Sequence, residues 1–192
     1  MVNYLIIKKL IEMKKKMKMM ILVMLVVGLI ISISCCRGMF TDEELTLRRE
    51  VYIGNELKID GYYYYIVPET NRTVIWFFYR NGVVLHGGTY MSVDFDEIEA
   101  EMVRWYSEKR KLKGSWGVFL IDGDKIQFER WAEAPNGVSL ATFRYSGNII
   151  NDTTIHITET YYSGRNETKQ IDEVWHYKQF DNKPDSTNAF IK

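Results

Sequence analysis

Short runs of alternating apolar and polar residues fill most of the chain after residue 60. Aromatic and β-branched residues dominate these runs, and turn dipeptides separate them: Asn81-Gly82, Asp122-Gly123, Asn136-Gly137 and Gly147-Asn148. Asn-Gly and Asp-Gly supply the positive φ angles that tight hairpins need, so the pattern predicts antiparallel strands. The expected strands cover residues 62–67, 74–80, 83–86, 116–121, 125–131, 138–145, 153–162 and 171–180.

One segment has helical spacing instead. Apolar residues recur at three- and four-residue intervals between residues 94 and 111, as in an amphipathic helix: Phe95, Ile98, Met102 and Trp105. Asp94 and Glu97 have the spacing of a capping box, and basic residues occupy the last turn, which suits the helix dipole. The sequence therefore predicts a mainly β fold: three strands, one helix and five strands, arranged as an antiparallel barrel or sandwich.

The first 34 residues have a different character. They contain six lysines and a single acidic residue, Glu12, and they end in an apolar run from Met19 to Ser34. The run is shorter than the roughly 20 residues that a membrane-spanning helix prefers. The order of basic, apolar and small residues is typical of a secretory signal peptide in front of a net acidic domain.

Ser32-Ile33-Ser34-Cys35 resembles the lipobox of bacterial lipoproteins, in which small residues precede a cysteine that becomes diacylated. The resemblance implies that Cys35 carries acyl chains such as palmitate, which hold the protein on a membrane of the cell envelope, expected to be the outer membrane. Each buried methylene contributes about 0.8 kcal/mol, so two or three chains give firm attachment. Cys36 is the second choice for the anchor, and an uncleaved signal anchor is the alternative. No cysteine follows Cys36, so the domain folds without internal disulfides.

The rest of the chain divides into a tether at residues 35–58, a barrel domain at residues 59–182 and a C-terminal tail at residues 183–192. The strand order and aromatic content of the barrel segment resemble the lipocalin-like lipoproteins of gut Bacteroidetes, which are small barrels behind a lipobox. The resemblance implies an eight-stranded lipocalin-like barrel with an interior cavity for a small apolar or amphipathic ligand.

Alternation along the strands predicts which side chains point into the barrel. Four charged residues share inward faces with apolar neighbours: Arg130, Arg144, Glu159 and Glu173. An unpaired buried charge costs several kcal/mol, so these residues pair, lie at an open mouth or anchor a ligand. The candidate ligand site consists of Phe128, Arg130, Arg144, Glu159, Glu173, Trp175 and Tyr177. The strand at 74–80 is apolar on both faces, which predicts that the helix or the tether covers its outer face.

The sequence gives little support for catalysis, a metal site or a cofactor. The three histidines lie on separate predicted strands, and the chain has neither a Gly-x-Ser-x-Gly elbow nor a glycine-rich phosphate loop. We therefore expect no enzyme, no metal site and no cofactor. The domain has no basic stretch with interleaved aromatics, so nucleic acid is not an expected partner. Two functions are favoured: a ligand-binding barrel, and an interaction lipoprotein of an envelope complex whose barrel core is solid. A third, an enzyme, would need a cluster of titratable groups in one pocket.

Overall fold

The computed structural model describes residues 13–25 and 41–192, and the chain divides into two units, residues 1–41 and residues 42–192. In the first unit residues 13–25 are helical. None of the helices among the described residues has both the length and the apolar character needed to cross a bilayer. Cys35, Cys36 and most of the predicted signal peptide lie outside the described residues.

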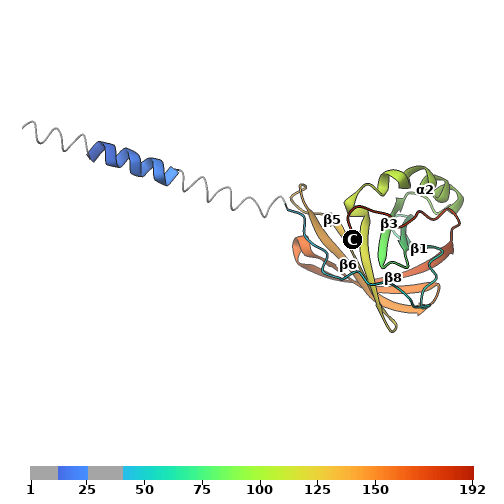
Figure 1. The fold of residues 1–192 in the computed structure, drawn as a ribbon. Helices are drawn as coiled ribbons and strands as arrows, with labels where there is room; N and C mark the ends of the chain where they lie inside the picture. The colour runs from blue at the N-terminus through green and yellow to red at the C-terminus, as the bar shows by residue number, and fades with distance from the viewer. Residues whose placement is uncertain (1–12, 26–40) are drawn as a thin grey trace, which may run out of the picture. The chain divides into compact units, whose positions relative to one another are not determined.

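Residues 42–192 contain a closed antiparallel barrel of eight strands, in which neighbours along the chain pair and the first strand pairs with the last (Figure 1). The strands are β1 (Gly61–Val67), β2 (Arg72–Phe78), β3 (Val83–Tyr90), β4 (Trp116–Asp122), β5 (Lys125–Glu133), β6 (Leu140–Asn151), β7 (Thr154–Tyr162) and β8 (Glu167–Gln179). Single turns of 3-10 helix precede β4 (Lys113–Ser115) and β8 (Ser163–Arg165). The predicted mainly β barrel with eight antiparallel strands is confirmed.

The connections between strands alternate between the two ends of the barrel. The β2–β3, β4–β5 and β6–β7 turns lie at one end, which we call the hairpin end. The β1–β2 turn, the chain between β3 and β4, and the β5–β6 and β7–β8 loops lie at the other, which we call the loop end. Gly82 and Gly123 have φ angles of 78° and 62° in two of the hairpin turns, as the Asn-Gly and Asp-Gly dipeptides predicted.

The predicted end of the sixth strand near residue 145 is wrong, because β6 continues through Gly147 to Asn151. A bulge lies between Ser146 and Gly147 opposite β7. A Cβ at Gly147 would lie 2.1 Å from the carbonyl oxygen of His156. The glycine therefore permits close approach of two strands instead of forming a turn.

The helix α2 (Phe95–Lys109) follows the third strand, as predicted. It packs on the outside of the barrel, where Ile98 and Met102 join a buried cluster that includes Ile75 and Phe77 of β2 (Figure 1). This confirms that the helix covers the outer face of the doubly apolar strand. Trp105, which the spacing placed on the same apolar face, is 50% exposed, so the buried stripe is narrower than expected.

Asp94 caps α2, since its carboxylate accepts hydrogen bonds from the backbone N–H groups of Asp96 at 2.9 Å and Glu97 at 3.4 Å. Asp94→Ala is expected to lower the free energy of unfolding by about 1 kcal/mol, because it leaves these donors without the side-chain acceptor. Asp94→Asn keeps an acceptor and should lie close to the wild type in urea unfolding. Equal losses for both variants would show that the charge, and not the cap, matters.

A second buried cluster fills the barrel itself. Trp76, Phe128 and Trp175 are at most 1% exposed and contact one another edge to face or at a tilt, with ring centroids 5.0 to 6.0 Å apart. An eight-stranded barrel has an interior just wide enough for side chains to fill. The middle of this barrel is therefore packed with aromatic side chains.

Residues 42–58, which we call the strap, lie against the barrel along their length. Backbone N–H groups of Glu43, Tyr52 and Lys58 donate to the carbonyls of Leu140, Arg80 and Asp152 at 2.8, 2.8 and 2.9 Å. The strap therefore runs from the loop end to the hairpin end, and the C-terminal part of the predicted tether is part of the folded unit. Phe190 and Ile191 of the predicted tail likewise pack against the cluster beneath α2.

Candidate functional site

The strap blocks the hairpin end of the barrel. Tyr52 and Leu57 are 8% and 2% exposed and belong to the same buried cluster as Trp76 and Phe128. The Tyr52 ring meets Phe119 edge to face at 5.7 Å, and its hydroxyl accepts a hydrogen bond from the Leu57 N–H at 2.7 Å. The strap therefore closes the hairpin end of the barrel.

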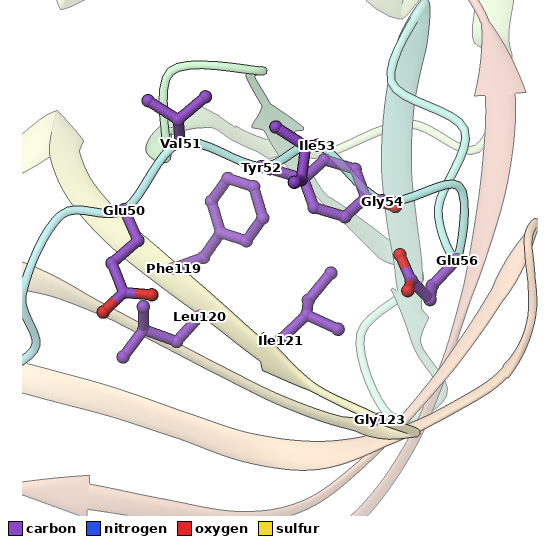
Figure 2. Close-up of a pocket in the computed structure, with 10 residues that line it drawn as sticks. All are labelled: Glu50, Val51, Tyr52, Ile53, Gly54, Glu56, Phe119, Leu120, Ile121 and Gly123. Carbon is purple, nitrogen blue, oxygen red and sulfur yellow. The ribbon is translucent and has the colours of Figure 1, made fainter.

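A small pocket of about 220 Å³ lies between the strap and β4 (Figure 2). Figure 2 shows Val51 and Ile53 of the strap on one side of it and Phe119 and Ile121 of β4 on the other. The charged residues that line this pocket are carboxylates from the strap. It is separated from the polar groups inside the barrel by the packed Tyr52 and Phe119 rings, so we place the candidate site elsewhere.

Polar side chains from five strands meet near the middle of the barrel, and we call them the interior polar cluster: Trp76, His86, Arg130, Tyr145 and Glu173. Trp76 and His86 lie opposite each other on β2 and β3, with ring centroids 4.8 Å apart. The Arg130 guanidinium lies 5.8 Å from the centre of the Trp76 ring, and the Tyr145 ring is 5.4 Å from it. Glu173 accepts a hydrogen bond from the Trp175 indole at 2.9 Å.

Two N–H donors in this cluster have no acceptor. Among the described residues four buried side-chain atoms lack a hydrogen-bond partner, and two of them, Trp76 Nε1 and Arg130 Nε, belong to these adjacent side chains. Leaving a buried donor unsatisfied costs about 1–3 kcal/mol. Arg130 also donates through Nη1 to the carbonyls of Gly114 at 3.1 Å and Trp131 at 2.8 Å, which fix the guanidinium in place.

Other tryptophans show how unusual Trp76 is. The indole N–H of Trp116 donates to the carbonyl of Arg110 at 2.8 Å, and that of Trp131 to the carbonyl of Glu43 at 2.7 Å. Buried indoles normally find such partners. The Trp76 indole N–H and the Arg130 Nε–H lie on adjacent side chains, and both can donate to an acceptor beside them.

Burial sets the protonation of the cluster. Burial, with the charges of Arg130 and Lys109, holds the pKa of His86 well below its usual value, so the imidazole is neutral near pH 7. Burial also raises the pKa values of Tyr145 and Glu173, although the Trp175 indole partly opposes the shift at Glu173. Arg130 is thus the fixed positive charge of the cluster. This charge favours a hydrogen-bond acceptor or an anion beside it.

His86 should make the stability of the barrel sensitive to acid. Its pKa is lower in the folded than in the unfolded chain, so the folded state binds fewer protons and stability falls as the pH drops below about 6.5. We expect a loss of about 1 kcal/mol between pH 7 and pH 5.5 in urea unfolding, and a flatter profile for His86→Phe.

The control for this experiment is His156→Gln, because His156 lies on the outer face of β7, where its Nε2 is 2.7 Å from Asp172. An unchanged pH profile in His86→Phe, or a flattened one in His156→Gln, would contradict the assignment.

Four of the predicted site residues lie in the interior near one another: Phe128, Arg130, Glu173 and Trp175. Phe128 stacks on Tyr145 at 4.6 Å and forms the floor below the cluster. Tyr177 also packs against the interior, but its hydroxyl donates to the Asp60 carboxylate near the hairpin end. It is therefore remote from the polar cluster along the barrel axis.

The expected inward orientation of Arg144 and Glu159 is wrong. Tyr145 of β6 pairs with Thr160 of β7, and both side chains face the interior, so the preceding residues on each strand point outward. A bulge between Ile157 and Glu159 opposite β8 shifts the alternation by one residue, and Glu159 accepts a hydrogen bond from Gln170 at 2.9 Å on the exposed surface. Arg144 instead pairs with Glu129 under the strap at 3.2 Å.

Sequence reasoning did not assign Trp76, His86 and Tyr145 to the site. His86 shares its strand face with Val84, which is buried inside the barrel, so alternation along β3 was the signal that placed it inward. The register that puts it opposite Trp76 depends on a bulge between Ile75 and Trp76. The extra residue of that bulge is Gly87, and Gly88 beside it has a φ of 121°, so the Gly87-Gly88 pair inside the strand was the signal for the bulge.

No family model matches the chain, and neither a curated protein nor a solved structure is similar enough to it to count as a match. The lipobox and the lipocalin-like resemblance therefore stay predictions. Within residues 13–25 and 41–192 there is also no group of three or more His, Cys, Asp or Glu residues arranged to hold a metal ion.

Proposed function

We propose that the protein is a lipid-anchored barrel that binds a small amphipathic molecule through a hydrogen-bond acceptor on its polar head. The observation that carries the proposal is the pair of buried, unsatisfied donors, Trp76 Nε1 and Arg130 Nε, on adjacent side chains. A carboxylate or carbonyl oxygen of the ligand satisfies both. Small-molecule sites typically combine an apolar lining with a few such polar groups.

We place the apolar part of the ligand against partly buried side chains that lie between the cluster and the loop end. Val74, Phe143 and Ile171 each precede a cluster residue by two positions on the same strand, and Tyr65 of β1 pairs with Val74; all four are only partly buried. The middle of the barrel is packed with Phe128, Trp76 and Trp175, so the ligand is short or leaves its tail outside the barrel. These positions support binding with the polar head of the ligand toward the cluster and its tail toward the loop end.

The anchor is the second part of the proposal. The lipobox-like sequence before Cys35 supports acylation of that cysteine, with Cys36 as the second choice, and attachment to the outer membrane of a bacterial envelope. The strap that follows is bonded to the barrel from Asp42 onward, so only a short segment separates the acylated residue from the folded unit. The protein therefore works close to a membrane surface.

The alternative is an interaction lipoprotein without a ligand. The observation in its favour is the solid centre of the barrel, where Trp76, Phe128 and Trp175 are almost completely buried. In that case a protein partner uses the outer surface, and the two unsatisfied donors are tolerated at a cost in stability.

Native mass spectrometry of the purified full-length protein separates the two functions. We expect a bound species of a few hundred daltons that organic extraction releases, and that is absent from the Arg130→Met variant. A protein that carries no such species, and that shows no saturable binding of dodecanoate, would support the alternative.

A further inference from the structure

We propose that the loop end of the barrel rests on the surface of the lipid bilayer. The inference rests on the proposed acylation of Cys35. It goes beyond the proposed binding activity because it names the surface that docks and the partner, a phospholipid bilayer. Three observations about the strap and the loop end carry it.

The first is where the strap begins. The Asp42 carboxylate accepts hydrogen bonds from the Leu140 N–H at 2.8 Å and from the Lys113 ammonium at 2.7 Å. The next residue, Glu43, donates to the Leu140 carbonyl and accepts from the Trp131 indole. Leu140 begins β6 and Lys113 precedes β4, both at the loop end. The chain is therefore fixed to the barrel at its loop end.

The second is the short reach of the chain before this point. Seven residue steps separate Cys35 from Asp42. A fully extended chain advances at most about 3.6 Å per residue, so these steps span roughly 25 Å. An acyl chain on Cys35 thus holds the bilayer surface within about that distance of the loop end, whatever path the intervening residues take.

The third is a set of exposed apolar side chains, which we call the apolar rim: Met91, Val93, Leu112 and Val138. They lie on the connections at the loop end and are 76%, 49%, 60% and 64% exposed. Leu112 adjoins Lys113, and Val138 lies two residues before Leu140, so both flank the bonds of Asp42. Apolar side chains beside a membrane anchor gain stability by entering the bilayer interface.

Exposed apolar residues also occur at the hairpin end, where Val51 and Ile53 are 67% and 87% exposed. Exposure alone thus does not choose between the ends. The choice follows from the anchor, because the strap has to run the length of the barrel before it reaches Val51. Ile53 is consequently a matched control for Leu112 and Val138.

Quenching by brominated lipid tests the orientation. Leu112→Trp, Val138→Trp and Ile53→Trp are made in the full chain, and acylation of Cys35 is checked by mass on each sample. The proteins are reconstituted in phosphatidylethanolamine–phosphatidylglycerol vesicles with and without bromine on the acyl chains, and the quenching of the wild-type tryptophans is subtracted. We expect the added tryptophan at 112 or 138 to be quenched at least about twofold more than that at 53.

Equal quenching at the three positions, or stronger quenching at 53, would overturn the proposed orientation. A protein without acyl chains would overturn the anchor and this inference together, and the mass measurement identifies that case. Ligand binding takes no part in the readout, so a failure of the binding proposal is distinguished by the dodecanoate titration of the same samples.

Discussion

Arg130→Met is expected to weaken the binding of dodecanoate, a short amphiphile with a carboxylate head, by about 10- to 100-fold. The reason is the loss of the only fixed cation of the interior polar cluster, together with one of its two free donors. A hydrogen bond to a charged group contributes about 1.5–3 kcal/mol, which corresponds to this range of affinity. Isothermal titration calorimetry of the full-length protein measures the change.

The variant should still fold. Methionine keeps the unbranched stem of arginine as far as the position of Nε and removes a desolvated charge, which offsets part of the loss of the bonds to the Gly114 and Trp131 carbonyls. Lys125→Met is the control, because it removes a positive charge from the exposed hairpin end of the same strand. A dissociation constant for Arg130→Met within a factor of two of the wild type would contradict the role of Arg130.

Glu129→Ala is expected to cause a large loss of stability, about 3 kcal/mol in the free energy of unfolding. The Glu129 side chain is completely buried, although it points away from the barrel interior. Its carboxylate accepts bonds from the backbone N–H groups of Thr46 at 2.6 Å and Leu47 at 2.9 Å, and it pairs with Arg144 at 3.2 Å. Removing it leaves these donors and a half-buried cation without their acceptor.

Urea unfolding with the wild type, Glu129→Gln and Glu133→Ala measures this effect. Glutamine keeps one acceptor oxygen and should lose less stability than alanine, and the exposed Glu133 on the same strand should change stability by no more than about 0.5 kcal/mol. A Glu129→Ala protein as stable as Glu133→Ala would show that the strap is held by its other contacts.

The barrel could be predicted from the sequence because, in most strands, the alternation of side chains and the turn dipeptides match the pairing of the strands in the structure. Ile126 and Phe128 alternate with polar residues, and both are fully buried inside the barrel. Asn81-Gly82 and Asp122-Gly123 are turns because their glycines adopt positive φ. The Gly147-Asn148 dipeptide does not form a turn. Gly147 lies inside β6, where its lack of a side chain permits close contact with β7.

The site was less predictable because it depends on bulges and on contacts far apart in the sequence. The bulge adds one residue before Glu159. Every later side chain of β7 therefore lies on the opposite face from the one that strict alternation predicts. Because Glu129 alternates with Phe128 and Ile126 along β5, it shares the outer face with Lys125 and Gln127. Its burial, however, comes from Thr46, 83 residues away, and no local pattern carries that information.

The Trp76 indole N–H gives the most direct test of the proposed function. The protein has five tryptophans. The indole N–H groups of Trp116 and Trp131 already donate to backbone carbonyls, so their signals serve as internal references. In nitrogen–proton NMR spectra recorded during a dodecanoate titration, we expect the Trp76 indole signal to move downfield most among them, and the Trp116 and Trp131 signals to stay in place. Saturable binding that leaves the Trp76 signal unmoved would contradict the proposal that this donor receives the ligand.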